Sequence, residues 1–426
     1  MRIIENPARS EWDALTRRQG VDYEGIRPRV QAILDAVEKE GDAALLRLMR
    51  EIDQVDAPLE VTEEEVDTAC RSMSRVVAEA IRTAKRNIEA FHQAQMPREI
   101  RVETSPGVVC IQRPVPIRRV GLYIPGGSAP LFSTVLMLAV PAALAGCRER
   151  ILCTPCRKNG SIAPEVLFAA RECGITRIFR IGGAQAVAAM AFGTETVPKV
   201  DKIFGPGNPY VTLAKQLVSG RNTAIDMPAG PSEVMVLADR RSTPPTFVAA
   251  DLLSQAEHGK DSTAVLVCTE SDYAERVMEE IERQRKMLPR NSQIDGALEH
   301  SFAVVLPDLQ TVIDFAEAYA PEHLIIALED AAEIARSITA AGSVFIGRWS
   351  PESAGDYASG TNHTLSTSGW ARSCSGVNMD SFLRKMTLQE LTRDGLAALT
   401  PTIAIMAQAE GLDAHARAVT IRIKGL

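Results

Sequence analysis

The sequence predicts an α/β protein built on parallel sheets, and three observations support this. From about residue 119 onward, short apolar runs alternate with Gly- or Pro-containing turns and with helical patterns. At 426 residues, the chain is long enough for two or more domains with sizeable cores. Its 46% hydrophobic and 24% charged residues are ordinary values for a globular protein.

The strands are expected in two series, each strand followed by a turn and a helix. The first series is expected at 120–124, 150–153, 177–181 and 202–204, with helices starting near 133, 163, 184 and after 208. The second series is expected at 234–237, 264–267, 302–306, 324–326 and 344–346.

The two ends of the chain differ from this alternation. Residues 1–21 are expected to form a short polar arm, followed by helical patterns over 27–53 and 62–95 and by a hairpin within 102–111. After about residue 375, helical stretches with short loops are expected at 379–386, 388–394 and 403–410. These stretches predict a small helical C-terminal unit.

Charge and composition exclude several classes of function. A net charge of −7 without a dense Lys/Arg block disfavours a general nucleic-acid binder. We expect no secretory signal, and the apolar window 128–147 contains Pro130 and Pro141, so a buried helix explains it better than a membrane span. Eight scattered cysteines predict reduced thiols and a cytoplasmic protein; for Cys153 and Cys156, a structural role is favoured over a redox role.

Four polar stretches contain the residues best suited to chemistry. They are SAGDYASGTNH at 353–363, QAEH at 255–258, EH at 322–323 and EGLDAH at 410–415. The first is too polar and too Gly-rich for a core element, so we expect it to be a loop at the end of a strand. Four of the six histidines of the chain lie in these stretches.

Gln255 and His258 are three residues apart at the predicted end of a helix, so they share one face. Taken alone, such a pair is more often solvated surface than a pair of metal ligands. Together with Asp356, however, these residues form a set of N and O donors that suits a borderline divalent ion, zinc first and manganese or iron as substitutes.

Glu322 and His323 are adjacent titratable groups at the edge of a predicted strand. A carboxylate can activate water, and an imidazole can take a proton near neutral pH. An exposed loop pair would be the more ordinary explanation of these two residues alone. For a dinucleotide, the signal is weak: Gly-rich turns precede helices, but there is no G-x-G-x-x-G motif.

Several longer motifs resemble those of the histidinol dehydrogenase family, from about residue 20 to the end of the chain. They are VGLYIPGG at 120–127, IGGAQA at 181–186, FGPGN at 204–208, IDMPAGPSEV at 225–234, DLLSQAEH at 251–258, APEHL at 320–324, SAGDYASGTNH at 353–363 and EGLDAH at 410–415. The resemblance implies oxidation of L-histidinol through L-histidinal to L-histidine, with two NAD reduced, in the last steps of histidine biosynthesis.

The resemblance also implies roles for single residues. Zinc would be bound by Gln255, His258, Asp356 and His415. Glu322 and His323 would be the acid/base pair. The substrate would contact these zinc ligands, Ser232, His323 and Glu410, and NAD would contact Tyr123, Gln185 and Asn208. The protein would be a homodimer in which Glu410 and His415 reach the site of the other subunit.

The fold implied by the resemblance has two incomplete Rossmann-like domains, which would explain the missing glycine motif. The expected boundaries are an arm at 1–21, a first domain at 22–122 plus 234–377, a second domain at 123–233, and the helical unit at 378–426. One departure from the family is Ser366, where the family usually has proline, and we expect a looser loop there. Cys374 is a second departure, because a larger or hydroxylated residue is expected at that position.

Alternatives remain open at this point. A related zinc-dependent dehydrogenase of another small amino or hydroxy alcohol would use the same residues. A zinc hydrolase would use Glu322 to activate water without a nucleotide, and a non-catalytic binding protein would retain only the fold.

Overall fold

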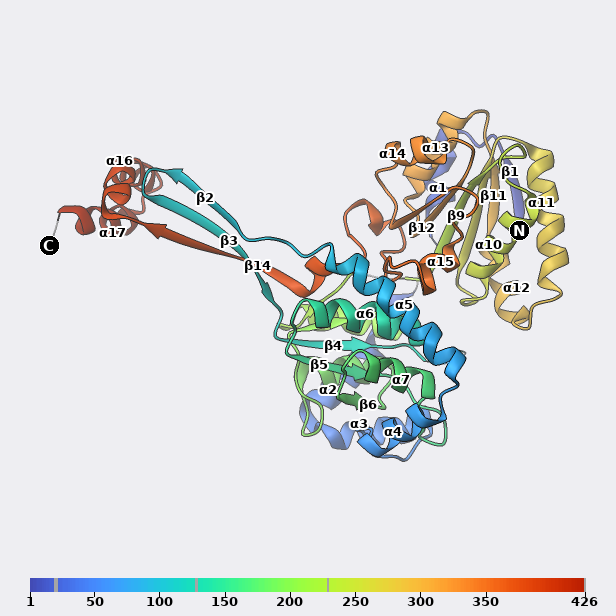
Figure 1. Ribbon diagram of the computed structural model, residues 1–426, viewed down its shortest axis with the longest axis horizontal. Helices are drawn as coiled ribbons and strands as arrows, with labels where there is room; N and C mark the ends of the chain where they lie inside the picture. The colour runs from blue at the N-terminus through green and yellow to red at the C-terminus, as the bar shows by residue number, and fades with distance from the viewer. Residues whose placement is uncertain (19–21, 127–128, 228–229, 425–426) are drawn as a thin grey trace. The chain divides into compact units, whose positions relative to one another are not determined.

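The computed structural model describes residues 1–18, 22–126, 129–227 and 230–424, and the chain divides into two compact units. The first unit comprises 1–95 and 118–379, and the second comprises 96–117 and 380–426. Within the first unit, two sheets are parallel throughout and carry helices on their faces (Figure 1). The predicted α/β class is therefore confirmed.

One sheet contains six strands among the described residues, and we call it the six-stranded sheet. Its order is β1 (Arg2–Glu5), β11 (Phe302–Val305), β10 (Thr263–Cys268), β9 (Glu233–Ala238), β12 (His323–Ala327) and β13 (Ser343–Ile346). The helices in this part of the chain are η1 (Arg9–Glu11), α1 (Trp12–Thr16), α10 (Pro245–Ala256), α11 (Ser271–Arg285), α12 (Asn291–His300), α13 (Leu309–Tyr319), α14 (Ala331–Ser337), α15 (Glu352–Tyr357) and η3 (Trp370–Arg372).

The central strand β9 is apolar on both faces because helices cover both sides of the sheet. Val234 and Val236 pack into the core cluster beneath α10, α11 and α12. Met235 and Leu237 point the opposite way, into the cluster formed with α1, α13 and α14. A strand buried on both faces appears in the sequence as a short continuous apolar run, which is how β9 was predicted.

The other parallel sheet contains five strands among the described residues, and we call it the five-stranded sheet. Its order is β6 (Arg177–Phe179), β5 (Glu149–Cys153), β4 (Arg119–Tyr123), β7 (Lys202–Phe204) and β8 (Ala224–Ile225). The helices in this part of the chain are α2 (Tyr23–Glu40), α3 (Asp42–Leu48), η2 (Met49–Asp53), α4 (Glu63–Ser72), α5 (Arg75–Gln93), α6 (Phe132–Leu144), α7 (Pro164–Glu172), α8 (Gly183–Phe192) and α9 (Pro209–Ser219).

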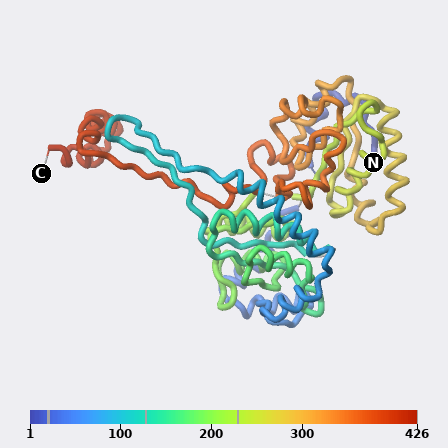
Figure 2. The backbone as a smooth tube through the Cα atoms, viewed as in Figure 1, coloured from blue at the N-terminus to red at the C-terminus, as the bar shows by residue number. Residues whose placement is uncertain are grey.

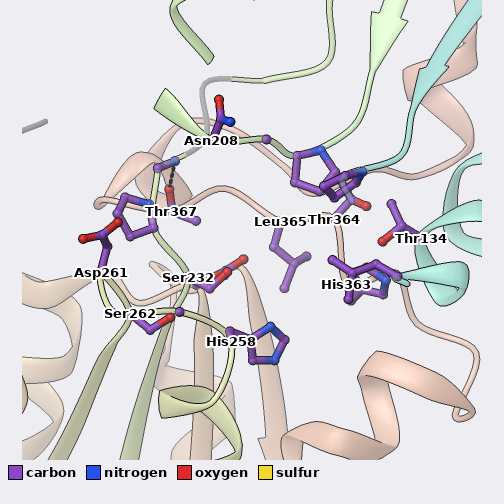
Figure 3. A pocket seen from close by; sticks show the side chains of 18 of the residues that line it. Thr134, Asn208, Ser232, His258, Asp261, Ser262, His363, Thr364, Leu365 and Thr367 are labelled. Atoms are coloured by element: carbon purple, nitrogen blue, oxygen red, sulfur yellow. Dashed lines mark hydrogen bonds between the residues drawn. The ribbon is translucent and has the colours of Figure 1, made fainter. Parts of the chain in front are cut away.

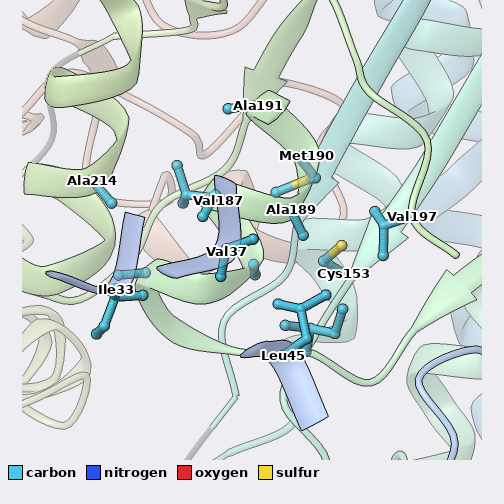
Figure 4. Close-up of a cluster of buried hydrophobic side chains, with 14 of the residues drawn as sticks. Ile33, Val37, Leu45, Cys153, Val187, Ala189, Met190, Ala191, Val197 and Ala214 are labelled. Carbon is cyan, nitrogen blue, oxygen red and sulfur yellow. The ribbon is translucent and has the colours of Figure 1, made fainter. Parts of the chain in front are cut away.

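Helices α2 and α3 pack in the part of the first unit that contains the five-stranded sheet, where α2 contacts α8 and α9 and α3 contacts α8. Ile33, Val37 and Leu45 pack against Val187 and Ala214 of α8 and α9 (Figure 4). Residues 22–122, which the sequence predicted to share a domain with 234–377, therefore include helices that pack with the five-stranded part of the chain. The apolar periodicity of α2 shows that one of its faces is buried, but it does not show which sheet that face covers.

The second unit corrects the prediction of an all-helical C-terminal segment. Its three strands among the described residues, β2 (Ile100–Ser105), β3 (Val108–Pro116) and β14 (Leu383–Leu391), form an antiparallel sheet in the order β14-β3-β2. The predicted hairpin is confirmed as β2 and β3. Residues 383–391, predicted to be mostly helical, form β14, which follows the short helix η4 (Met379–Phe382). Helices α16 (Arg393–Ala409) and α17 (Asp413–Lys424) pack on each other.

The N-terminal arm is also more regular than predicted. Arg2–Glu5 forms β1 and pairs in parallel with β11, and the blue N-terminal trace lies among the yellow and orange segments in Figure 2. A strand of four residues holds only one apolar pair, which is too short for a pattern to be detected. The expected helices at 27–53 and 62–95 are each interrupted, at Gly41, where φ is +56°, and at Ser74, whose hydroxyl caps α5.

His92 is fully buried near the end of α5. Its Nδ1 lies 2.8 Å from the carbonyl oxygen of Ile88, which can only accept, so Nδ1 carries the proton. Its Nε2 lies 3.3 Å from the side-chain amide nitrogen of Asn362, which donates to it. The imidazole is therefore held neutral.

Burial lowers the pKa of His92 below its usual 6.5, and the hydrogen bond to Ile88 only partly opposes this. The unfolded chain binds a proton at this histidine more readily, so the stability that His92 contributes is present above its unfolded pKa and is lost as the pH falls through the folded pKa. We expect a His92→Gln variant to lose less stability than the parent between neutral pH and about pH 5. Urea unfolding midpoints across this range would measure the difference, and parallel pH profiles would contradict it.

Among the described residues, no helix combines the length and the apolar character needed to cross a membrane. The location predicted from the sequence stays a prediction.

Candidate active site

A cavity of about 310 Å³ in the first unit contains most of the residues singled out in the sequence. The turns after β4 and β7 contribute Pro125 and Asn208 to its lining. Ser232, Ser262 and Glu322 line it from positions immediately before β9, β10 and β12. The cavity therefore lies at the carboxyl edge of the five-stranded sheet and the amino edge of the six-stranded sheet. Figure 3 shows Ser232, His258 and His363 around it.

A cluster of potential metal ligands lies at one side of the cavity. His258 follows the end of α10, and Glu352 and Asp356 are one turn apart on α15. Their nearest ligand atoms all lie within 4.8 Å of one another. The His258 Nε2 and an Asp356 carboxylate oxygen are 3.8 Å apart. The sequence predicted a loop over 353–363, but its first part is the helix α15, which places these two carboxylates on one face.

Unpartnered polar atoms mark the same cluster. Gln255 is fully buried on α10, and neither its amide oxygen nor its amide nitrogen has a hydrogen-bond partner among the described residues. Both carboxylate oxygens of the buried Glu352 also lack a hydrogen-bond partner there, although one of them lies 3.3 Å from the His323 Nδ1. Buried polar atoms normally find partners, so this set suits a bound cation. Nitrogen and oxygen donors in this mixture suit zinc or a similar divalent ion.

Glu322 and His323 are held by the backbone of one residue on the neighbouring strand. The Glu233 amide donates to the Glu322 carboxylate at 2.9 Å. The His323 Nδ1 lies 3.2 Å from the Glu233 carbonyl oxygen, so Nδ1 carries the proton and donates to it. The other ring nitrogen, Nε2, has no hydrogen-bond partner among the described residues and lies 3.8 Å from Asp356. His323 thus presents a free lone pair toward the cluster.

Burial determines the protonation of the site. It raises the pKa of the Glu322 and Glu352 carboxyls well above their usual value, and neighbouring carboxylates raise them further. Burial also raises the pKa of Asp356 to about 7 and lowers the pKa of His323 to about 3. Crowded carboxyl groups of this kind favour a positive ion, because its charge stabilises their ionised forms.

The three residues expected to contact NAD lie at the carboxyl edge of the five-stranded sheet. The Tyr123 hydroxyl, at the end of β4, accepts a hydrogen bond from the Gly183 amide at the start of α8. Gln185, also on α8, donates to Asp53 at 3.3 Å. Asn208 caps α9 after β7 and lines the cavity. Ligands of open parallel sheets commonly bind at this kind of edge, where the strand order reverses between β4 and β7.

Glu410 and His415 belong to the second unit. Glu410 ends α16, His415 lies in the first turn of α17, and both are exposed. All the described residues that line the cavity belong to the first unit. Of the four zinc ligands that the resemblance implied, His258 and Asp356 line the cavity, whereas Gln255 and His415 are not among the described residues that line it.

Two features of the site were not predicted. Glu352 was missed because 353–363 was interpreted as a loop; its spacing of four residues from Asp356 would have placed both on one helix face. His363, to which no role was given, lines the cavity, and burial lowers its pKa to about 4. The first part of IDMPAGPSEV includes residues 228 and 229, which lie outside the described residues, as does Gly127 of VGLYIPGG.

The departure at Ser366 has a structural counterpart at Cys374. Ser366 is fully buried, and its hydroxyl donates to the Cys374 carbonyl oxygen at 3.2 Å. A proline at 366 could not make this contact, because it has no hydroxyl. The two positions at which the sequence departs from the expected pattern therefore contact each other.

The fold and the site together define the class of protein, an oxidoreductase built on parallel α/β sheets. The family model described as histidinol dehydrogenase matches residues 16–423. The chain belongs to the histidinol dehydrogenase family, as its motifs predicted.

Relatives of known name match all or nearly all of the chain. Histidinol dehydrogenase from Bacteroides thetaiotaomicron is 53% identical over 427 residues, covering 100% of both chains. Histidinol dehydrogenase from Escherichia coli K12 is 52% identical over 406 residues, covering 95% of this chain and 92% of the relative. The crystal structure of histidinol dehydrogenase from Elizabethkingia anophelis matches with a TM-score of 0.96 and 47% identity, covering 100% of this chain and 98% of that one.

Proposed function

We propose that this enzyme oxidises L-histidinol through L-histidinal to L-histidine, with NAD as the oxidant and zinc as the bound metal. The arrangement of Glu322 and His323 at the start of β12, beside the cluster of His258, Glu352 and Asp356, carries the proposal. In this proposal His323 is the proton acceptor, Glu322 is the water-activating carboxylate, and the cluster is the donor set for a cation, all lining one cavity. The names of the relatives support L-histidinol as the substrate.

The balanced reaction converts one histidinol, one water and two NAD into one histidine and two NADH, with release of protons. When bound, zinc would anchor nitrogen atoms of the substrate, and NAD would accept the hydride in each oxidation. Gln255, His258 and Asp356 would hold the metal, with His415 as the fourth protein ligand. Tyr123, Gln185 and Asn208 would contact NAD, and Ser232 and Glu410 would contact the substrate.

His323 would act as the base in both oxidations. Its Nδ1 is occupied by the Glu233 carbonyl, so only Nε2 can accept a proton. The low pKa of His323 that burial causes keeps the imidazole neutral and available at neutral pH. The Nε2 would take the hydroxyl proton of the alcohol in the first step and of the aldehyde hydrate in the second.

Glu322 would activate the water that adds to the aldehyde. Burial raises the pKa of this carboxyl above its usual value, which brings a general base closer to the working pH. The Glu233 amide fixes one oxygen of the carboxylate, and the other remains available to the water. Hydration of the aldehyde within the site would keep the intermediate bound between the two oxidations.

An assay of NAD reduction tests the proposal. The purified, zinc-loaded protein is given L-histidinol and NAD, and NADH absorbance and histidine are measured together. The expected result is two NADH for each histidine formed. Turnover of another amino or hydroxy alcohol in preference to L-histidinol would instead support a related dehydrogenase, and ester or amide hydrolysis without NAD would support a zinc hydrolase.

Loss of one carboxylate is expected to weaken metal binding. An Asp356→Asn variant should bind zinc at least about 10–100-fold more weakly, a cost typical even for the loss of an outer-shell partner. Zinc content after dialysis against a chelator, measured by mass spectrometry, checks this without an activity assay. The matched control is Asp13→Asn, an exposed position on α1, which should keep the zinc content of the parent. Equal zinc retention in the two variants would argue against Asp356 as a ligand.

We also propose a homodimer in which a second copy of the chain donates Glu410 and His415 to the cavity. Exposed apolar side chains beside Glu410 support an interface there: Ile405 and Met406 on α16 are 67% and 60% exposed. The test mixes two variants, His258→Ala and His415→Ala, each expected to be inactive alone. Random reassociation should restore about a quarter of the parent activity, because half of the dimers are mixed and each has one intact site. No restoration in confirmed mixed dimers would contradict the exchange.

A further inference from the structure

The N-terminal arm ends in a buried ion pair to which the proposed chemistry gives no role. The Arg18 side chain is only 14% exposed, and the Glu233 side chain is 1% exposed. The pair is bidentate, with the Arg18 Nε 2.7 Å and Nη2 2.8 Å from the two Glu233 carboxylate oxygens. Planar, two-point contacts of this kind fix both partners in orientation as well as in position.

The remaining contacts of the pair hold it rigidly. The Arg18 guanidinium lies over the Tyr319 ring, 3.5 Å from its centroid, and the Tyr319 hydroxyl donates to Glu233 at 3.4 Å. The Ser368 amide donates to the other Glu233 oxygen at 3.1 Å. Arg18 also donates to the Ala320 carbonyl oxygen at 3.4 Å. Four separate segments of the first unit thus meet at one arginine–carboxylate pair.

Two of these segments lead directly to the catalytic pair. The backbone of Glu233 donates to Glu322 and accepts from His323, so the position of residue 233 sets the orientation of both side chains. Ala320 lies two residues before Glu322 and has a positive φ of +51°, a backbone conformation that a non-glycine residue adopts only when its surroundings enforce it. Arg18 contacts both of these points.

We propose that Arg18 is a positioning residue for Glu322 and His323, acting through the Glu233 side chain and the Ala320 carbonyl. The inference rests on the proposed roles of Glu322 and His323. Without Arg18, the Glu233 carboxylate would be buried without its counter-charge and would move. The start of β9 would shift with it, and the two hydrogen bonds that orient the catalytic pair would lengthen.

The effect is expected on turnover rather than on substrate binding, because Arg18 does not line the cavity among the described residues. A misplacement of about 1 Å at reacting groups can cost about 100-fold in rate. We expect Arg18→Gln to lower kcat by about 10–100-fold for both L-histidinol and L-histidinal, with KM for either changed by less than about 3-fold. Zinc content should be that of the parent.

The experiment compares three arginine variants in the full-length, zinc-loaded protein. Arg18→Gln removes the charge, and Arg18→Lys keeps the charge but not the two-point contact, so its kcat should lie between those of Arg18→Gln and the parent. Arg17→Gln is the matched control, an exposed arginine one position earlier in the same arm, and should have the parent kcat. Melting temperature, zinc content, kcat and KM are measured for each.

A folded, zinc-containing Arg18→Gln protein with the parent kcat would overturn the inference, as would an equal loss in Arg17→Gln. If Arg18→Gln does not fold, the Tyr319→Phe variant tests the inference instead, because it removes only the hydroxyl that donates to Glu233. The loss of this one modest hydrogen bond should lower kcat by about 2–5-fold. A folded Tyr319→Phe with the parent kcat would then overturn the inference. If the parent protein does not reduce NAD with L-histidinol, this result contradicts the proposed function and not the role of Arg18. The two proposals can therefore be contradicted separately.

Discussion

A His323→Asn variant is expected to lower kcat by about 10²–10⁴-fold in both oxidations, the range typical of a lost general base. Only the Nε2 of His323 is free to accept a proton, and asparagine offers no comparable base at that point. The side-chain amide of asparagine can still donate to the Glu233 carbonyl, so the fold around β12 should be preserved. Steady-state rates with L-histidinol and with L-histidinal measure the two steps separately.

Two further variants isolate the role of His323. Glu322→Gln should retain the first NADH from L-histidinol but stall before the acid, because it cannot activate water. His300→Asn, at the end of α12, should keep the parent rate and controls for loss of a histidine elsewhere in the same unit. Equal loss of both half-reactions in Glu322→Gln would count against a separate role in hydration.

A Lys215→Met variant is expected to lower the free energy of unfolding by about 3–5 kcal/mol, the cost of leaving a buried charge without its partner. The Lys215 ammonium pairs with Asp226, and their side chains are 4% and 1% exposed. Lys215 also donates to the Gly205 carbonyl oxygen at 2.8 Å. In the variant, Asp226 would keep its hydrogen bonds from the Gly205 and Met227 amides but would have no counter-charge.

Urea unfolding at neutral pH measures this loss, and a double variant identifies its cause. Lys215→Met combined with Asp226→Asn removes both charges and should recover part of the stability, since the amide can still accept from the backbone. Lys158→Met, at an exposed position, controls for loss of a lysine. If the double variant is as unstable as the single one, packing rather than the unpaired charge is responsible.

The strands of the parallel sheets could be predicted because each of them has a recognisable local sequence pattern. The apolar runs at 120–124 and 234–237 lie between glycine- or proline-containing turns and helical patterns, and a strand buried on both faces needs no information about its neighbours. The local sequence pattern did not identify the strand β14. The spacing of Leu383, Met386 and Leu388 fits a helix as well as it fits a strand. The partner strand β3, which would decide between them, lies about 270 residues earlier in the chain.

The candidate site was predicted unevenly for a similar reason. The residue types at 255–258, 322–323 and 356 suggested their chemistry, and the family resemblance supplied their roles. Glu352 was missed because the helix α15 was interpreted as part of a loop. Glu233 was missed because it matters through its backbone atoms, which every residue possesses. Arg18 belongs to an arm that composition marks only as polar.

The three-stranded sheet of the second unit joins segments from two distant parts of the chain, with β14 on one side of β3 and β2 on the other. Shortening the protein from its carboxyl end to before residue 383 would therefore remove a strand of this sheet and not a separate appendage. It would strip β3 of a nine-residue partner and leave a bare two-stranded ribbon, which is marginal in water and open to pairing with other chains. We expect the truncated protein to aggregate and precipitate, and not to remain as a smaller, soluble and folded protein.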